Sequence, residues 1–308
     1  MNTIEEKFIK KYTTASGHNR AFVKFTGLKT LWFNTGTLCN LSCDGCYIES
    51  SPINNKLLYL DTKDVDRYLK QIEIDKLSCD TIGITGGEPF MNKDIISILN
   101  LCAKRNYNIL VLTNAMQPML NKIKELKTFS NYKKLTLRVS LDHYSKEEHE
   151  NIRGKNTWDK ALKGICWLES NNFKINIASR IINKNEELVR DGFAKLFKKS
   201  NLTIDAYNKN DLVLFPEMNC YSDTPEITTD CWDILNNNPK NMMCSNSRMI
   251  VKRREDSKTH IVSCTLIPFE RDFSYGSNLK DSFKKIYLNH PFCSKFCVLG
   301  GASCSNNP

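Results

Sequence analysis

Apolar runs and helix-like segments alternate along most of the chain. Apolar runs predict strands at 31–33, 81–85, 108–112, 135–141, 173–181 and 212–215. Helices are predicted at 92–105, 116–128, 157–170 and 186–199. Successive strand-then-helix units predict an α/β fold, with a parallel sheet and helices outside it, as an open sheet or a partial barrel.

Small and polar residues follow the predicted strands. A cysteine-containing loop follows the first strand, Gly86-Gly87-Glu88-Pro89 follows the second, and Thr113-Asn114 follows the third. Asp142 follows the fourth. In parallel α/β folds the chemistry gathers at the carboxyl ends of the strands. We therefore expect the functional site at this edge of the sheet.

Composition divides the chain into four parts. Residues 1–27 form a polar lead-in, 28–218 hold the strand–helix units, 219–243 have a loop-like composition, and 244–308 are rich in cysteine. The last part is predicted to contain a hairpin of 249–253 with 260–264 and a helix at 279–288. A region this small usually needs a metal or disulfide staple.

The 308 residues carry a formal charge of +10, but their densest basic cluster is only Lys252-Arg253-Arg254. We interpret the charge as a solvated surface and do not expect a nucleic-acid partner. No apolar run approaches the length of a membrane span, and the N-terminus lacks the apolar core of a secretion signal. The expected location is the cytoplasm.

The chain has 13 cysteines, three of them clustered as Cys39, Cys43 and Cys46. An odd number cannot pair completely, and clustered cysteines in a reducing compartment more often bind metal. Thiolates favour iron–sulfur clusters, zinc or copper(I). Three ligands on a four-iron cluster would leave one iron open to a small molecule. A zinc site with a fourth ligand from elsewhere is the alternative.

The Gly86-Gly87-Glu88-Pro89 turn has two interpretations. Its glycines would let the backbone approach a ligand closely, and Glu88 could accept hydrogen bonds from an ammonium group. Taken alone, the turn also fits a plain connection in which Glu88 and Pro89 open the next helix.

Together these motifs resemble the radical S-adenosylmethionine (SAM) superfamily. Ser140-Leu141-Asp142 and His149-x-x-x-Arg153-Gly154 follow the cysteine and glycine motifs in order. The resemblance covers about residues 31–182 firmly and is to the branch with C-terminal auxiliary clusters. It implies a partial (β/α)6 barrel, and a [4Fe–4S] cluster on Cys39, Cys43 and Cys46 to which SAM binds.

The resemblance also implies which residues hold SAM: Gly86, Gly87 and Glu88 at its amine, Ser140 by a hydrogen bond, and Arg153 at its carboxylate. The family usually has an aromatic residue before the third cysteine, whereas this chain has Gly45, with Tyr47 after the cysteine. Either Tyr47 contacts the adenine or SAM binds slightly differently. Which carbon–sulfur bond of SAM is cut therefore stays open.

The C-terminal cysteines resemble the "twitch" type of auxiliary cluster domain. Cys244 and Cys264 flank the predicted hairpin, and Cys293 and Cys297 follow the predicted helix. These four are the expected ligands of a second [4Fe–4S] cluster, with Cys304 as substitute or bystander. Its role would be to take an electron from a substrate radical or to bind substrate. The alternatives are a structural zinc or unligated thiols.

Five other cysteines and one carboxylate have mixed interpretations. Cys79, Cys102 and Cys166 are predicted to be buried apolar residues, while Cys220 and Cys231 are either incidental thiols or additional ligands. Asp142 is either an acid or base near the substrate or a helix N-cap.

The expected function is an enzyme, an oxidoreductase or modifying enzyme, that cleaves SAM to a 5′-deoxyadenosyl radical and abstracts hydrogen from a small molecule or a peptide. Its electron would come from a donor such as flavodoxin or ferredoxin. The chain length leaves little room for a peptide-recognition domain, which slightly favours a small molecule. Alternatives are cleavage of the other carbon–sulfur bond with aminocarboxypropyl transfer, a non-catalytic iron–sulfur or zinc redox protein, and, from charge alone, RNA modification.

Overall fold

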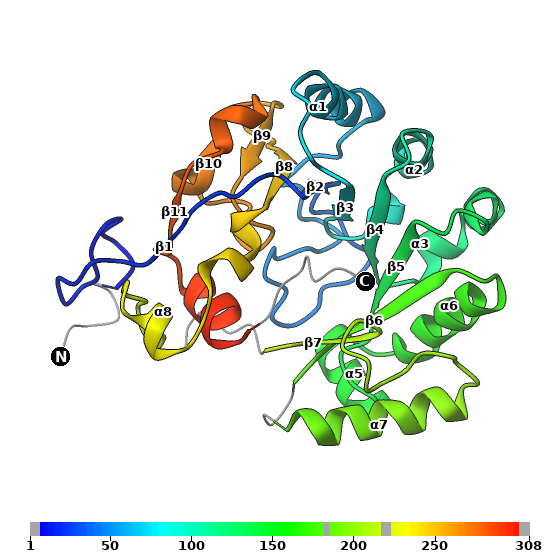
Figure 1. The fold of residues 1–308 in the computed structure, drawn as a ribbon. Coiled ribbons are helices and arrows are strands. Elements are labelled where there is room, and N and C mark those ends of the chain that lie inside the picture. Colours follow the sequence, from blue (N-terminus) through cyan, green and yellow to red (C-terminus); the bar gives the residue numbers. More distant parts are fainter. Residues whose placement is uncertain (1–6, 182–184, 217–222, 302–308) are drawn as a thin grey trace.

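The computed structural model describes residues 7–181, 185–216 and 223–301 (Figure 1). Their main sheet has the strand order β10-β9-β8-β2-β3-β4-β5-β6-β7. Six consecutive strands are mutually parallel: β2 (Thr30–Asn34), β3 (Thr81–Thr85), β4 (Asn108–Thr113), β5 (Leu135–Ser140), β6 (Lys174–Arg180) and β7 (Leu212–Phe215). The sheet is open, with β10 and β7 at its edges, so the predicted α/β partial barrel is confirmed.

Helices lie outside this curved sheet (Figure 1). They are α1 (Thr62–Ile74), α2 (Ile95–Lys104), α3 (Gln117–Leu120), α4 (Ile123–Leu126), α5 (Lys146–Arg153), α6 (Trp158–Ser170) and α7 (Glu186–Lys199), with α8 (Cys231–Ile234) apart from them. Sequence reasoning missed α1, which begins with a capping box of Asp61 and Asp64. The helix predicted at 116–128 is divided into α3, α4 and a 3-10 turn at Lys127–Phe129.

A glycine in β3 makes room for the largest buried side chain of the core. Trp32 in β2 is fully buried and pairs with Gly83. A Cβ atom at Gly83 would lie 2.3 Å from the Trp32 ring, closer than carbon atoms approach without a shift. The indole therefore lies across the neighbouring strand only because residue 83 lacks a side chain.

The C-terminal part of the chain extends the same sheet. The predicted hairpin is confirmed, since β8 (Ser247–Lys252) and β9 (Thr259–Val262) pair antiparallel, and β10 (Ser274–Tyr275) adds to β9. β8 also pairs parallel with β2. The main sheet thus contains strands from both sides of residue 244, where the sequence predicts a domain boundary. The division into domains stays a prediction.

The helix predicted at 279–288 is wrong. A 3-10 turn at Leu279–Ser282 is followed by β11 (Ile286–Tyr287), which pairs antiparallel with β1 (Phe22–Val23). The Asn278 side chain caps the short turn, and pairing with β1 then satisfies backbone groups that a helix would have used. Tertiary pairing has overridden the local helical pattern.

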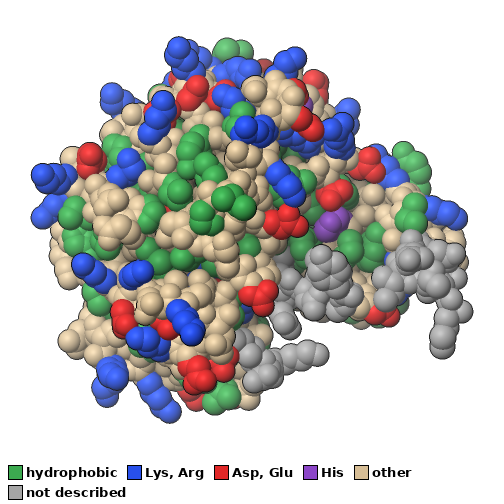
Figure 2. All heavy atoms as spheres, turned by 180° about the vertical axis from the view of Figure 1, so that it is seen from behind, with side chains coloured by type: hydrophobic (Ala, Val, Ile, Leu, Met, Phe, Trp, Pro, Cys, Tyr) green, Lys and Arg blue, Asp and Glu red, His purple; other side chains and the backbone are tan. Residues whose placement is uncertain are grey.

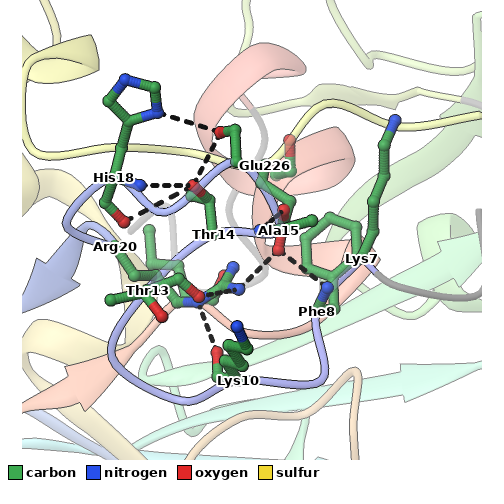
Figure 3. A network of polar contacts seen from close by, with 12 residues as sticks. Lys7, Phe8, Lys10, Thr13, Thr14, Ala15, His18, Arg20 and Glu226 are labelled. Atoms are coloured by element: carbon green, nitrogen blue, oxygen red, sulfur yellow. Dashed lines mark hydrogen bonds and ion pairs between the residues drawn. The ribbon is translucent and has the colours of Figure 1, made fainter. Parts of the chain in front are cut away.

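Residues 7–20 wrap around one buried ion pair (Figure 3). Arg20 Nη2 lies 2.5 Å from Glu226 Oε1, with side-chain exposures of 0% and 7%. Glu226 also accepts hydrogen bonds from the backbone N–H groups of Phe8 and Ala15, and Arg20 donates to the Lys10 carbonyl. Because all the groups are paired, the lead-in is held to the residues that precede α8.

No helix among the described residues is long and apolar enough to cross a membrane. On the face shown in Figure 2, lysine and arginine side chains are spread among carboxylates rather than gathered in one stripe. This distribution agrees with the interpretation of the charge as a solvated surface.

Candidate functional site

One cavity of about 190 Å³ lies at the carboxyl ends of the parallel strands. It brings together the three clustered cysteines and most of the predicted SAM-binding residues: Cys39, Cys43, Cys46, Tyr47, Gly86, Gly87, Ser140 and Arg153. The loops after β2, β3 and β5 supply most of them. Residues from widely separated parts of the sequence thus line one space, as the parallel sheet predicts.

The three thiols sit in surroundings that disfavour free thiolates. Burial raises the pKa of Cys39 to about 12, and burial also raises the pKa of Cys43, partly offset by Arg153. A bound cluster with iron ions would supply the positive charge that stabilises thiolates here. Three soft donors around one cavity fit the [4Fe–4S] cluster that the sequence predicts.

The two glycines let β3 meet the cysteine loop closely. Gly87 N–H donates to the Gly36 carbonyl, and a Cβ atom at Gly87 would lie 2.3 Å from the Leu38 carbonyl oxygen. Gly86 has φ of 142°, which favours glycine. The glycines therefore fix the loop that leads into Cys39, besides lining the cavity.

Glu88 does not itself line the cavity, although Thr113 and Asn114, which it contacts, do. Its carboxylate is 1% exposed and accepts hydrogen bonds from Thr113 Oγ1 and Asn114 N–H, both at 2.8 Å, and from Phe90 N–H. Burial raises its pKa. Glu88 thus holds the end of β4 in place, and its contact with the SAM amine stays a prediction.

Asp142 joins two arginines beside the cysteine loop. Asp142 Oδ2 accepts a 2.6 Å hydrogen bond from Arg153 Nε, and Oδ1 lies 3.4 Å from Arg180 Nε. Arg180 also donates to the carbonyl of Asp44, between Cys43 and Cys46. Burial raises the pKa of Asp142, but the charges of Arg153 and Arg180 outweigh burial and lower it overall. The two arginines account for the buried carboxylate of Asp142 without a helix-capping role.

The departure at Gly45 has a local cause. Gly45 has φ of 63° and lines the cavity next to Tyr47. An aromatic residue in this left-handed conformation would be strained. The turn between Cys43 and Cys46 therefore favours glycine, and Tyr47 is the aromatic residue of this loop that lines the cavity.

Sequence reasoning missed part of the cavity wall. Phe215 and Phe296 stack with ring centroids 5.4 Å apart, and Leu266 lies beside them. Arg138 in β5 and Arg180 in β6 also line the cavity. Arg180 could have been found from its position near the end of the predicted strand at 173–181, but nothing local in the sequence places Phe296 at a site built from residues 39–180.

The C-terminal cysteines surround a second, mainly apolar cavity. Cys244, Cys264, Cys293 and Cys297 all line it, with Cys293 and Cys297 on one π-helix (Cys293–Leu299). Burial raises the pKa of Cys244 to about 11 and that of Cys293 to about 12. Cys304 and Cys220 lie outside the described residues.

In the described parts of the chain, no three Cys, His, Asp or Glu side chains form a ready site for a single metal ion. Four soft sulfur donors around one cavity suit an iron–sulfur cluster and equally a structural zinc ion. Cys231 packs in the same apolar cluster as Cys244, Cys293 and Cys297, but it does not line this cavity.

The fold and the cavity define a radical SAM protein. Residues 33–190 match the Radical SAM superfamily, and the chain belongs to this family. The match contains the three clustered cysteines, the glycine turn and Arg153. As a member of the family, the chain uses a [4Fe–4S] cluster and SAM.

Several known proteins are similar to this chain. AlbA of Bacillus subtilis, an antilisterial bacteriocin subtilosin biosynthesis protein, is 30% identical over 171 residues, which are 52% of this chain and 36% of AlbA. SuiB of Streptococcus suis bound to SAM has a TM-score of 0.61 at 15% identity, covering 84% of this chain and 65% of SuiB. The structure of anSMEcpe with bound AdoMet has the same TM-score and identity, covering 83% and 77%. At this identity the two structures show the fold alone.

Proposed function

We propose that the chain is a radical SAM enzyme that modifies a peptide by abstracting hydrogen from it. The carrying observation is that Cys39, Cys43 and Cys46 share one cavity with Gly87, Ser140 and Arg153, while Phe215, Leu266 and Phe296 form an apolar wall. Such a cavity offers donors for a cluster, polar groups for SAM, and a surface that excludes water from a reactive radical.

The similar proteins favour a peptide over a small molecule. AlbA is named for biosynthesis of the bacteriocin subtilosin. SuiB has been solved bound to the precursor peptide SuiA, and anSMEcpe with bound AdoMet and the Kp18Cys peptide. The slight preference for a small molecule rested on chain length alone, which is the weaker argument. We therefore propose a peptide substrate.

A [4Fe–4S] cluster held by Cys39, Cys43 and Cys46 would supply the electron for reductive cleavage of SAM, and the resulting 5′-deoxyadenosyl radical would abstract hydrogen from a substrate carbon. Arg153 uses Nε for Asp142, which leaves its other nitrogens for the SAM carboxylate. The Ser140 hydroxyl lies at the end of β5 and lines the same cavity, where it can donate to SAM.

The second cavity supports the proposed auxiliary cluster on Cys244, Cys264, Cys293 and Cys297. Leu266 lines both cavities, so the two lie side by side. An electron from a substrate radical would have a short path to this cluster. Oxidation of the substrate would then be balanced, because the electron leaves through the second cluster to an acceptor protein.

The test is anaerobic. The clusters are reconstituted and reduced with dithionite, SAM is added, and its fragments are identified by mass spectrometry. We expect 5′-deoxyadenosine, lost in Cys43→Ala and retained in Cys166→Ala, because the half-buried Cys166 lies on α6 and does not line either cavity.

Two outcomes would contradict the proposal. Methylthioadenosine in place of 5′-deoxyadenosine would mean cleavage of the other carbon–sulfur bond and aminocarboxypropyl transfer. No fragment at all from a fully reduced, SAM-bound protein would favour a redox carrier.

A further inference from the structure

The densest basic cluster of the sequence has no part in the proposed chemistry. Lys252 Nζ is paired with Asp64 at 2.8 Å. Arg253 and Arg254, in contrast, line a separate cavity of about 590 Å³. Its remaining lining residues are Asn55, Lys56, Leu57, Glu255, Phe269 and Arg271. We call this space the basic cavity.

The basic cavity is at the same end of the sheet as the cysteine loop. β8 runs parallel to β2, so Arg253 leaves the sheet where the loop to Cys39 does. Arg254 N–H donates to the Lys56 carbonyl at 3.0 Å, and Leu57 N–H donates to Thr37 Oγ1 at 3.1 Å. One wall of the basic cavity is thus continuous with the segment that carries the cluster ligands.

The cations of the basic cavity outnumber its carboxylates. Glu255 is its single carboxylate, 2.8 Å from Arg271 Nη2 and 3.8 Å from Arg253 Nη1. Arg254 is exposed and makes no ion pair with any residue that the structure describes. Lys56 lies over the Phe269 ring at 5.4 Å and pairs with the exposed Glu49. The cavity therefore carries uncompensated positive charge.

Arg253 is the buried member of this set. Its side chain is 10% exposed, and its Nη2 has no hydrogen-bond partner among the described residues. A buried guanidinium with unmade hydrogen bonds destabilises the fold. A guanidinium can donate to both oxygens of a carboxylate at once, so a carboxylate that reaches Arg253 would satisfy it.

We propose that the basic cavity binds the carboxylate side chains of an acidic segment of the peptide substrate, away from the residue that reacts. That the segment belongs to the substrate rests on the proposed function. The volume is in the range of pockets that hold a drug-sized ligand. Phe269 adds an aromatic wall for the aliphatic part of a glutamate. Binding here would raise the local concentration of the reacting residue at the radical cavity.

A nucleic acid would need a longer basic track. The cations of the basic cavity are confined to 56, 253, 254 and 271. This distribution favours a short acidic peptide, and we make nucleic acid an outcome of the test.

The test measures fluorescence anisotropy of a fluorescein-labelled hexaglutamate peptide with the full reconstituted protein in 150 mM salt. We expect binding that Arg254→Ala weakens, that Arg254→Glu weakens further, and that Arg254→Glu with Arg271→Glu weakens at least tenfold. The control for Arg254→Glu is Lys209→Glu, which makes the same change of charge on an exposed loop before β7 and so at the opposite end of the sheet. We expect Lys209→Glu to change affinity less than twofold.

Three results would overturn the proposal. One is an equal loss in the Lys209→Glu and Arg254→Glu proteins, and another is equal binding of a hexaglutamine peptide. The third is tighter binding of a single-stranded oligonucleotide of equal charge that also depends on Arg254. This binding assay contains no SAM or reductant. Its result therefore does not depend on whether the protein cleaves SAM.

Discussion

The carboxylate of Asp142 holds Arg153 at 2.6 Å and, through its other oxygen, faces Arg180 at 3.4 Å. Arg153 comes from α5 and Arg180 from the end of β6, while Asp142 follows β5. One buried carboxylate therefore sets the distance between two strand ends and the turn that holds Cys43 and Cys46.

Asp142→Asn should destabilise the fold strongly, because it leaves two partly buried guanidinium groups without their counter-ion. We expect a loss of about 3 kcal/mol, the usual cost of removing one partner of a buried pair. Urea unfolding of the cluster-free protein measures it. Asp159→Asn, which breaks an exposed pair with Lys146, should cost much less, because solvent screens exposed ion pairs. Equal losses in the two variants would contradict this stabilising role of Asp142.

Gly83→Ala should also destabilise the fold, because the added Cβ meets the Trp32 ring. Overpacking of this kind costs about 1–3 kcal/mol. Gly276→Ala is the matched control, since nothing lies within 4 Å of its Cβ position, and it should stay within about 0.5 kcal/mol. Comparable unfolding midpoints for the two variants would contradict this packing.

The stability of the cluster-free protein should fall as the pH drops from about 6.5 to about 4. His149 is fully buried, neither ring nitrogen has a partner among the described residues, and burial lowers its pKa from 6.5 to about 4. A lowered histidine pKa means that the neutral form stabilises the fold above the unfolded pKa, and this contribution is lost as protons bind on acidification.

His149→Phe keeps an aromatic ring beside Trp158 but removes the titrating group. The slope of its unfolding free energy against pH should be smaller than that of the unchanged protein. The difference should correspond to up to about one proton taken up on unfolding. Identical slopes over this pH range would show that His149 does not titrate as expected.

The iron content should separate the two cysteine sets. A protein with two [4Fe–4S] clusters binds about eight irons. Cys244→Ala with Cys293→Ala should lower this to about four, and so should Cys39→Ala with Cys43→Ala. Iron and acid-labile sulfide analysis after reconstitution gives the counts, with Cys166→Ala as the unchanged control. Full iron content in the variant with both Cys244→Ala and Cys293→Ala would contradict the proposed second cluster.

Much of this architecture could be predicted from local pattern. The six parallel strands and the gathering of Cys39, Gly87 and Arg153 follow from apolar runs and from residues at strand ends. The predicted strand at 81–85 coincides with β3.

The sequence-based predictions are wrong or incomplete where contacts between distant parts of the chain determine the local structure. The helical pattern at 279–288 yields to pairing of β11 with β1, more than 250 residues earlier in the chain. Phe296 reaches the radical cavity by the same kind of contact. Helix α1 was missed although its capping box is a local signal.

The pairing of β8 with β2 has a consequence for the order of biosynthesis. β2 is fully buried between β3 and β8, and β8 begins at Ser247. A ribosome must therefore translate most of the chain before the strand that leads into the cysteine loop gains its second neighbour. Domains fold as units once their sequence has emerged. The thiols of Cys39, Cys43 and Cys46 would reach their final geometry late, so iron delivery belongs after translation rather than during it.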